Sequence, residues 1–239
     1  TTRVCAYDRA GLAWSDPGPA DETMEQTASD LHALLAAAKE PGKYVLVGAS
    51  IGGLYIRAYH RAFPGEVAGL VFTNSANRVG IVGTSGLLWE ITEDAVRSAY
   101  PLRGLTKPPK PAREGEPFDR LSPELQATRL WMDVRNWERW NPETAEPTSM
   151  LSWRREFLRE FDETDASPSP LGALPVVVVS SAGIASDAER RSRAGAMARL
   201  DFLSTKSVHI TADGSGHEIH LFQPDRVVEG IAAAVKMVR

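Results

Sequence analysis

The stretch from residue 44 to residue 63 limits the fold more than any other part of the chain. Four apolar residues at 44–47 run directly into the turn GASIG at residues 48–52, and residues 51–63 then follow a helical pattern that ends at a Pro-Gly pair. An uninterrupted apolar strand is typical of a parallel sheet that helices cover on both faces. The sequence therefore predicts a strand, a sharp turn and a helix within an α/β fold.

The same alternation recurs on both sides of this stretch. Further strands are predicted at residues 4–7, 67–73, 175–179 and 207–210, and further helices at residues 24–38, 188–203 and 225–238. Pro224 lies at the start of the last helix, in the first-turn position where proline is common. Strands that alternate with helices predict a mostly parallel sheet with helices on both faces.

The alternation stops between residues 75 and 171, a segment that holds most of the chain's 6 tryptophans. Its residues 123–140 and 150–161 follow a helical pattern, and the proline-rich residues 107–111 are typical of an extended connector. We expect a helical cap at residues 75–171, inserted into one core domain formed by residues 1–74 and 172–239. The tryptophans are expected mainly to pack the cap onto the core.

Charge and cysteine content argue against several classes of function. The 27 Lys and Arg against 31 Asp and Glu give a net charge of -4, which leaves no basic surplus for binding nucleic acid. The single Cys5 allows neither an internal disulfide nor a cysteine-based zinc site, and no apolar run reaches the roughly 18 residues of a membrane span. We expect no metal and no organic cofactor. The compartment stays open, with the cytoplasm favoured.

Ser50 is the candidate nucleophile, because its G-x-S-x-G motif follows a strand and opens a helix, where a strained turn exposes the hydroxyl. A serine hydroxyl needs a base that takes its proton. His217 is the candidate base, because it ends the loop 213–216 that follows the last strand, at the sheet edge where Ser50 is expected. The other histidines are predicted in helices, in the last strand or beyond this loop: His32, His60, His209 and His220.

Three stretches together resemble the α/β-hydrolase superfamily, in particular its bacterial esterase-like members. They are AYDRAG with the following WSDPG at residues 6–18, YVLVGASIGGL at residues 44–54 and SGHEIHLFQP at residues 215–224. The resemblance implies that Ser50 is the nucleophile, His217 the general base and the backbone N–H of Ile51 an oxyanion-hole donor. It implies a serine hydrolase that cleaves small-molecule carboxylic esters through an acyl-serine intermediate without a cofactor.

The acid that orients the histidine has two positions in this family. After the strand at residues 67–73, where relatives often carry aspartate, the chain has Asn74, an amide that cannot stabilise imidazolium by charge. After the strand at residues 175–179 the nearest carboxylate is Asp187, which could instead cap the next helix. We favour Asp187 and keep Asn74 as the alternative position.

The resemblance also implies that the chain begins after three family strands and without the loop that supplies a second oxyanion amide. We therefore expect a one-strand gap between the strands at residues 4–7 and 44–47, or an N-terminal segment or second chain that fills it. The missing loop and Asn74 favour an alternative function, a non-catalytic ligand-binding protein on the same fold. Hydrolysis of amide or peptide bonds is a second alternative, because the same catalytic residues serve it.

Overall fold

The computed structural model describes residues 2–18, 23–40, 42–75, 81–82, 88–89, 109–139, 156, 158–159, 167, 169–181 and 203–239. These residues belong to two compact units. One unit comprises Met24–Tyr100 and Ser152–Arg239, and the other comprises Thr1–Thr23 and Pro101–Leu151. The first unit contains a parallel sheet, and the second contains a helix of 17 residues.

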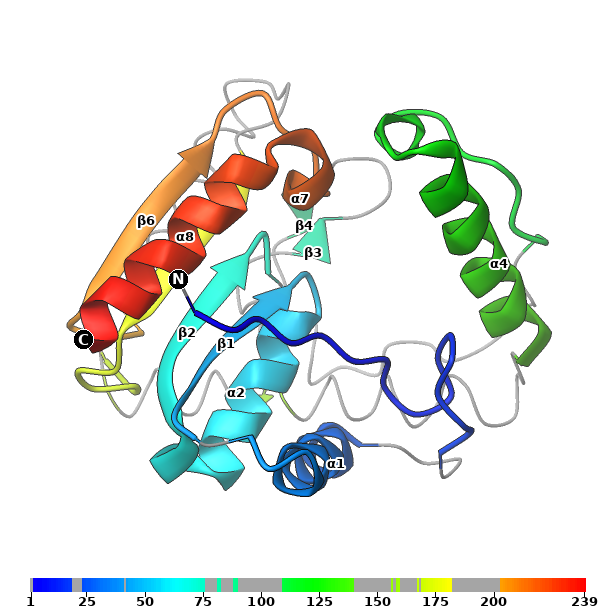
Figure 1. The fold of residues 1–239 in the computed structure, drawn as a ribbon. Helices are drawn as coiled ribbons and strands as arrows, with labels where there is room; N and C mark the ends of the chain where they lie inside the picture. The colour runs from blue at the N-terminus through cyan, green and yellow to red at the C-terminus, as the bar shows by residue number, and fades with distance from the viewer. Residues whose placement is uncertain are drawn as a thin grey trace. The chain divides into compact units, whose positions relative to one another are not determined.

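The larger unit is built on a four-stranded sheet with the strand order β1-β2-β5-β6. Neighbouring strands are parallel throughout, and β1 and β2 lie side by side with their arrowheads pointing the same way (Figure 1). This pairing confirms the predicted α/β fold, and the four strands occur where the sequence predicted them. They are β1 (Tyr44–Ala49), β2 (Val67–Thr73), β5 (Val176–Ser181) and β6 (Ser207–Ala212).

Alternate residues of the sheet bury against different helices. Phe72 and Val178 share a buried cluster with residues of α1 (Met24–Ala37) and α2 (Gly52–Ala62), whereas Val71 and Val179 share another with Ala234 of α8 (Pro224–Val238). The alternation follows from the two-residue period of a strand. It explains why β2 and β5 are mostly apolar on both faces, and the three helices confirm the predicted ones.

Several short elements were not predicted. They are the 3-10 helix η1 (Pro64–Glu66), the short helix α7 (Ile219–Phe222) and an antiparallel pair formed by β3 (Ile81–Val82) and β4 (Leu88–Trp89). Runs of two to four residues carry too little periodicity to be recognised in a sequence. The helix predicted at residues 188–203 lies outside the described residues, apart from its last residue. None of the described helices is long and apolar enough to cross a membrane.

The strand predicted at residues 4–7 is wrong. Residues 2–9 take no regular secondary structure, and Val4 is 76% exposed. A β-strand requires a ladder of backbone hydrogen bonds to a neighbouring strand. This segment pairs with none of the described strands. Within the described sheet β1 pairs with β2 along one edge. That a further strand pairs with the other edge of β1 stays a prediction.

The smaller unit contains α4 (Pro123–Arg139), which confirms the helix predicted at residues 123–140, and η2 (Phe118–Arg120). The guanidinium of Arg139 donates to the carbonyl oxygens of Gly11 and Ser15, at 2.9 and 3.1 Å. The rings of Trp14 and Trp131 lie 5.0 Å apart between their centroids. The N-terminal loop and α4 are therefore packed together. Most of the cap predicted at residues 75–171 lies outside the described residues.

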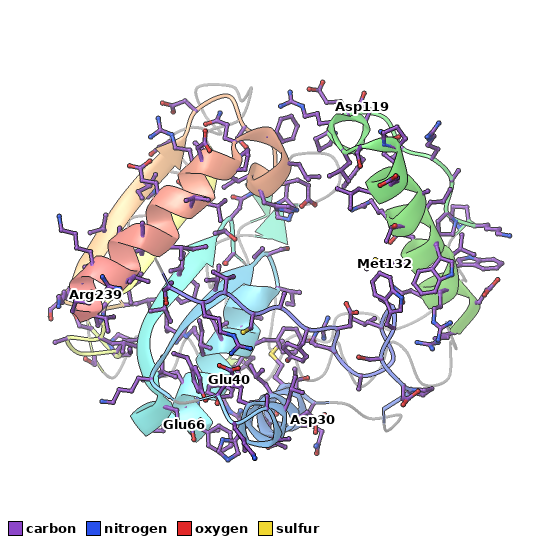
Figure 2. All side chains as sticks on the ribbon, in the orientation of Figure 1. Asp30, Glu40, Glu66, Asp119, Met132 and Arg239 are labelled. Carbon is purple, nitrogen blue, oxygen red and sulfur yellow. The ribbon has the colours of Figure 1, made fainter. Side chains whose placement is uncertain are left out.

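A polar cluster joins α1 and α2 to the start of β2. The Glu66 carboxylate accepts a hydrogen bond of 2.6 Å from the Tyr59 hydroxyl and lies 3.1 Å from Nδ1 of His32. The bond from Tyr59 is the main reason why the pKa of Glu66 lies below its usual value, and His32 adds to the lowering. Glu66 lies at the end of the sheet away from the arrowheads of β1 and β2 (Figure 2). We therefore assign this cluster a structural role.

Candidate active site

Ser50 occupies a sharp turn between β1 and α2. Its φ of 50° lies in the left-handed region, which a residue with a side chain seldom adopts. The Ser50 N–H donates to the Thr73 carbonyl of β2 at 3.2 Å, and the Ser50 carbonyl accepts from the Gly53 N–H at 3.1 Å. The turn is therefore fixed on both sides by backbone bonds. Strain of this kind is typical of functional positions.

The glycines around Ser50 differ in the space that they leave. A Cβ at Gly48 would lie 2.4 Å from the Gly52 carbonyl oxygen, and a Cβ at Gly53 would lie 2.6 Å from Cβ of Ser75. A Cβ at Gly52 would meet no atom within 4 Å. The G-x-S-x-G motif has its two glycines at Gly48 and Gly52. The structure instead assigns the close contacts to Gly48 and Gly53.

We expect Gly48→Ala to destabilise the fold by about 1–3 kcal/mol, the usual range for overpacking, because the new methyl group would meet backbone atoms that cannot move aside. Gly52→Ala is the matched control and should unfold at nearly the wild-type urea concentration. Urea unfolding followed by circular dichroism measures both variants. Equal midpoints for the two variants would contradict this description of the turn.

Ser75 also supports the turn, and sequence reasoning missed it. Its hydroxyl donates to the Gly48 carbonyl oxygen at 2.6 Å, and the Thr73 hydroxyl reaches the same oxygen at 3.4 Å. Ser75 is 4% exposed. Two hydroxyls, one from the last residue of β2 and one from two residues beyond it, thus satisfy the carbonyl that precedes the turn. A serine and a threonine after a buried strand were the available signal, but they occur in many loops.

His217 lies in the loop after β6 and contacts Asn74, which follows β2. Nδ2 of Asn74 is 2.8 Å from Nδ1 of His217 and donates to the His217 carbonyl oxygen at 3.2 Å. Asn74 is 7% exposed and has a φ of 44°, a conformation that asparagine tolerates better than most residues. The structure therefore brings His217 to Asn74, the alternative acid position. Asp187 lies outside the described residues.

Ser181, the last residue of β5, holds the other end of the Asn74 amide. Its hydroxyl donates to Oδ1 of Asn74 at 3.2 Å, and the Asn74 N–H donates to the Val179 carbonyl at 2.7 Å. Ser181 is 4% exposed. Sequence reasoning missed this residue, although the two serines that end an otherwise all-valine strand were a signal. Asn74 is therefore held by β5 and by the His217 loop.

Ser50 and His217 follow β1 and β6, so both lie at the edge formed by the carboxyl ends of the parallel strands. This edge is where open α/β sheets place their functional groups. Ile51 directly follows Ser50 and has helical backbone angles, so its N–H is among the first-turn amides that lack an acceptor within the helix. The site thus contains a hydroxyl, an imidazole and a helix amide.

A serine and a histidine on neighbouring strands of the same sheet form a close pair. Oγ of Ser180 is 2.7 Å from Nε2 of His209, and Ser180 is 5% exposed. Ser180 belongs to a strand rather than to a strained turn, which makes the pair a useful control for Ser50 and His217. Among the residues that the structure describes, no three His, Cys, Asp or Glu side chains are placed to bind a metal ion.

Comparison with known proteins relates the whole chain to one family. A profile described as the alpha/beta hydrolase family matches residues 1–230. An uncharacterized protein of Schizosaccharomyces pombe is 37% identical over 76 residues, which are 32% of this chain and 14% of that protein. The match therefore spans a small part of that relative's length.

Solved structures show the same fold. A thermophilic esterase from Thermogutta terrifontis matches with a TM-score of 0.62 and 22% identity, over 97% of this chain and 78% of the esterase. An esterase from Exiguobacterium antarcticum matches with a TM-score of 0.56 and 19% identity, over 96% and 80% of the two chains. A bromoperoxidase from Bacillus anthracis has a TM-score of 0.56 and 18% identity, with the same coverage.

Proposed function

The chain belongs to the alpha/beta hydrolase family, and we propose that it is a serine hydrolase that cleaves small-molecule carboxylic esters through an acyl intermediate on Ser50. The observation that carries the proposal is the φ of 50° at Ser50, in a turn between β1 and the first amides of α2. Such a turn presents a hydroxyl next to N–H groups that can bind an oxyanion.

In this proposal Ser50 attacks the ester carbonyl carbon while its proton passes to Nε2 of His217. The carbonyl oxygen becomes an oxyanion, which the Ile51 N–H stabilises. When the tetrahedral intermediate collapses, the bond to the alkoxy oxygen breaks and His217 returns the proton to the leaving alcohol. Water then attacks the acyl carbon while its proton passes to His217. The bond to the Ser50 oxygen breaks and His217 returns the proton to that oxygen, which releases the carboxylic acid and restores Ser50.

A non-catalytic ligand-binding protein is the second candidate, and the amide at position 74 favours it. A carboxylate beside the histidine would stabilise the imidazolium that forms during attack, whereas an amide does so poorly. The two candidates differ in one chemical property, the reactivity of the Ser50 hydroxyl. Amide and peptide-bond hydrolysis would share that reactivity and are distinguished from ester cleavage by the substrates that turn over.

A fluorophosphonate probe tests the proposal, because it forms a stable bond with an activated serine. We expect one label per chain, found by peptide mass spectrometry on Ser50. Ser180, whose hydroxyl contacts the imidazole of His209, is the internal control and should remain unlabelled. A folded sample that takes up no label would support the binding protein, and a label on Ser180 would contradict the assignment of Ser50.

A further inference from the structure

The side-chain amide of Asn74 makes three polar contacts, and together they fix which end faces His217. Its Nδ2 contacts Nδ1 of the imidazole at 2.8 Å and the His217 carbonyl oxygen at 3.2 Å. Its Oδ1 accepts the Ser181 hydroxyl at 3.2 Å. A primary amide has two N–H donors on its nitrogen, so Nδ2 can serve both His217 atoms at once.

Rotating the amide by half a turn would remove this match. Oδ1 would then lie against the carbonyl oxygen of His217, which can only accept hydrogen bonds. The misfit would be costly because Asn74 is 7% exposed, which leaves little access for water to separate the two oxygens. The carbonyl oxygen of His217 therefore decides the orientation, with the N–H groups of the amide toward the imidazole.

We infer that Asn74 holds neutral His217 in the tautomer that carries its proton on Nε2. Nδ1 must accept the Asn74 N–H, so the ring proton has to sit on the other nitrogen. A carboxylate at the same place would accept a proton from Nδ1 and leave Nε2 free. The inference about the tautomer stands on the contacts of Asn74 alone.

Its consequence for catalysis rests on the proposed function. A base that receives the Ser50 proton on Nε2 needs that nitrogen unprotonated, and Asn74 stabilises the opposite form. Asn74 is thus a positioning residue that holds His217 in the form unable to take the Ser50 proton, which keeps turnover low. Replacing an orienting aspartate by asparagine in other serine enzymes costs about 10⁴ in kcat through the same wrong tautomer. Asn74→Asp, the reverse substitution in this protein, should therefore recover much of this loss in kcat.

The first test is the tautomer of the wild-type protein, measured by NMR of ¹⁵N-labelled histidine at a pH where His217 is neutral. His217→Gln identifies its signals by their disappearance. We expect a protonated Nε2 and an unprotonated Nδ1 in the wild type. In Asn74→Asp, where aspartate also tolerates the positive φ, the assignment should reverse. A protonated Nδ1 in the wild type would overturn the inference, with no variant needed.

The second test is turnover of para-nitrophenyl acetate by the same samples. Asn74→Asp should raise kcat by about 10²- to 10⁴-fold. It should also move the acidic limb of kcat/KM to higher pH, because the carboxylate would raise the pKa of the neighbouring imidazole. Ser180→Ala, a control at a serine outside the proposed catalytic groups, should change kcat little. A loss of about 10⁴ in Asp187→Asn together with unchanged turnover in Asn74→Asp would overturn the inference.

The two tests separate this inference from the proposed function. If the tautomer reverses as expected while Ser50 takes no fluorophosphonate label in either protein, the role of Asn74 in fixing the tautomer stands and the proposal of a serine hydrolase fails. If Ser50 is labelled and the wild-type Nδ1 is protonated, the hydrolase stands and the inference fails. Circular dichroism and thermal unfolding confirm that each variant is folded.

Discussion

Ser50→Ala is expected to lower the turnover of para-nitrophenyl acetate sharply while leaving the fold unchanged. Loss of the nucleophile from a complete triad costs on the order of 10⁶ in kcat. The wild-type protein already lacks about 10⁴ of that rate, because Asn74 holds His217 in the wrong tautomer. We therefore expect a loss of about 10²-fold in the wild-type background and of about 10⁶-fold in the Asn74→Asp background. Steady-state kinetics on identically purified proteins measures both losses.

The control for this substitution is Ser180→Ala, which removes a hydroxyl that contacts the imidazole of His209 at 2.7 Å. It should leave kcat within about twofold of its parent, because surface or strand substitutions away from the site act mainly on stability. Circular dichroism should be the same for Ser50→Ala and its parent. If turnover survives Ser50→Ala and disappears in Ser180→Ala, the nucleophile is Ser180 and the assignment of Ser50 is wrong.

His217→Gln is the second large effect that we expect. Glutamine keeps a polar side chain of similar reach but cannot accept and return a proton at neutral pH, so the serine loses its base. In the Asn74→Asp background the loss in kcat should be on the order of 10⁶, close to that of Ser50→Ala. Combining the two substitutions should add little further loss, because residues that act as one unit are not additive.

His209→Gln is the matched control for this prediction. His209 lies on β6, eight positions before His217 (217 − 209), and its Nε2 contacts Ser180. The variant should keep the turnover and the pH profile of its parent. If His209→Gln abolishes turnover and His217→Gln does not, the base has been assigned to the wrong histidine.

The sheet could be predicted from sequence because its central strands β2 and β5 consist mostly of apolar residues. β2 occurs at the predicted residues 67–73, and burial on both faces explains why Val71 and Phe72 are equally buried although they face different helices. The strand predicted at residues 4–7 was inferred from the same kind of apolar pattern, and it is wrong. Its residues have strand propensity, but propensity does not supply a neighbour to pair with.

The candidate site could be predicted only in part. The G-x-S-x-G pattern located the turn at Ser50, and the loop after the last strand located His217. The contact between Asn74 and His217 depends on the order of β2, β5 and β6 in the sheet, and no local stretch of the sequence determines that order. The role of Ser181 depends on the same order, because its hydroxyl meets Asn74 across neighbouring strands.

The central claim is that esters are cleaved through an acyl group on Ser50, and trapping that intermediate tests it most directly. A reaction of the Asn74→Asp protein with para-nitrophenyl acetate is quenched in acid during turnover, digested and mapped by mass spectrometry. Our account predicts one acetyl group, located on Ser50, that is absent in Ser50→Ala and decays when substrate is exhausted. Turnover without an acetylated Ser50, or an acetyl group that persists without turnover, would contradict it.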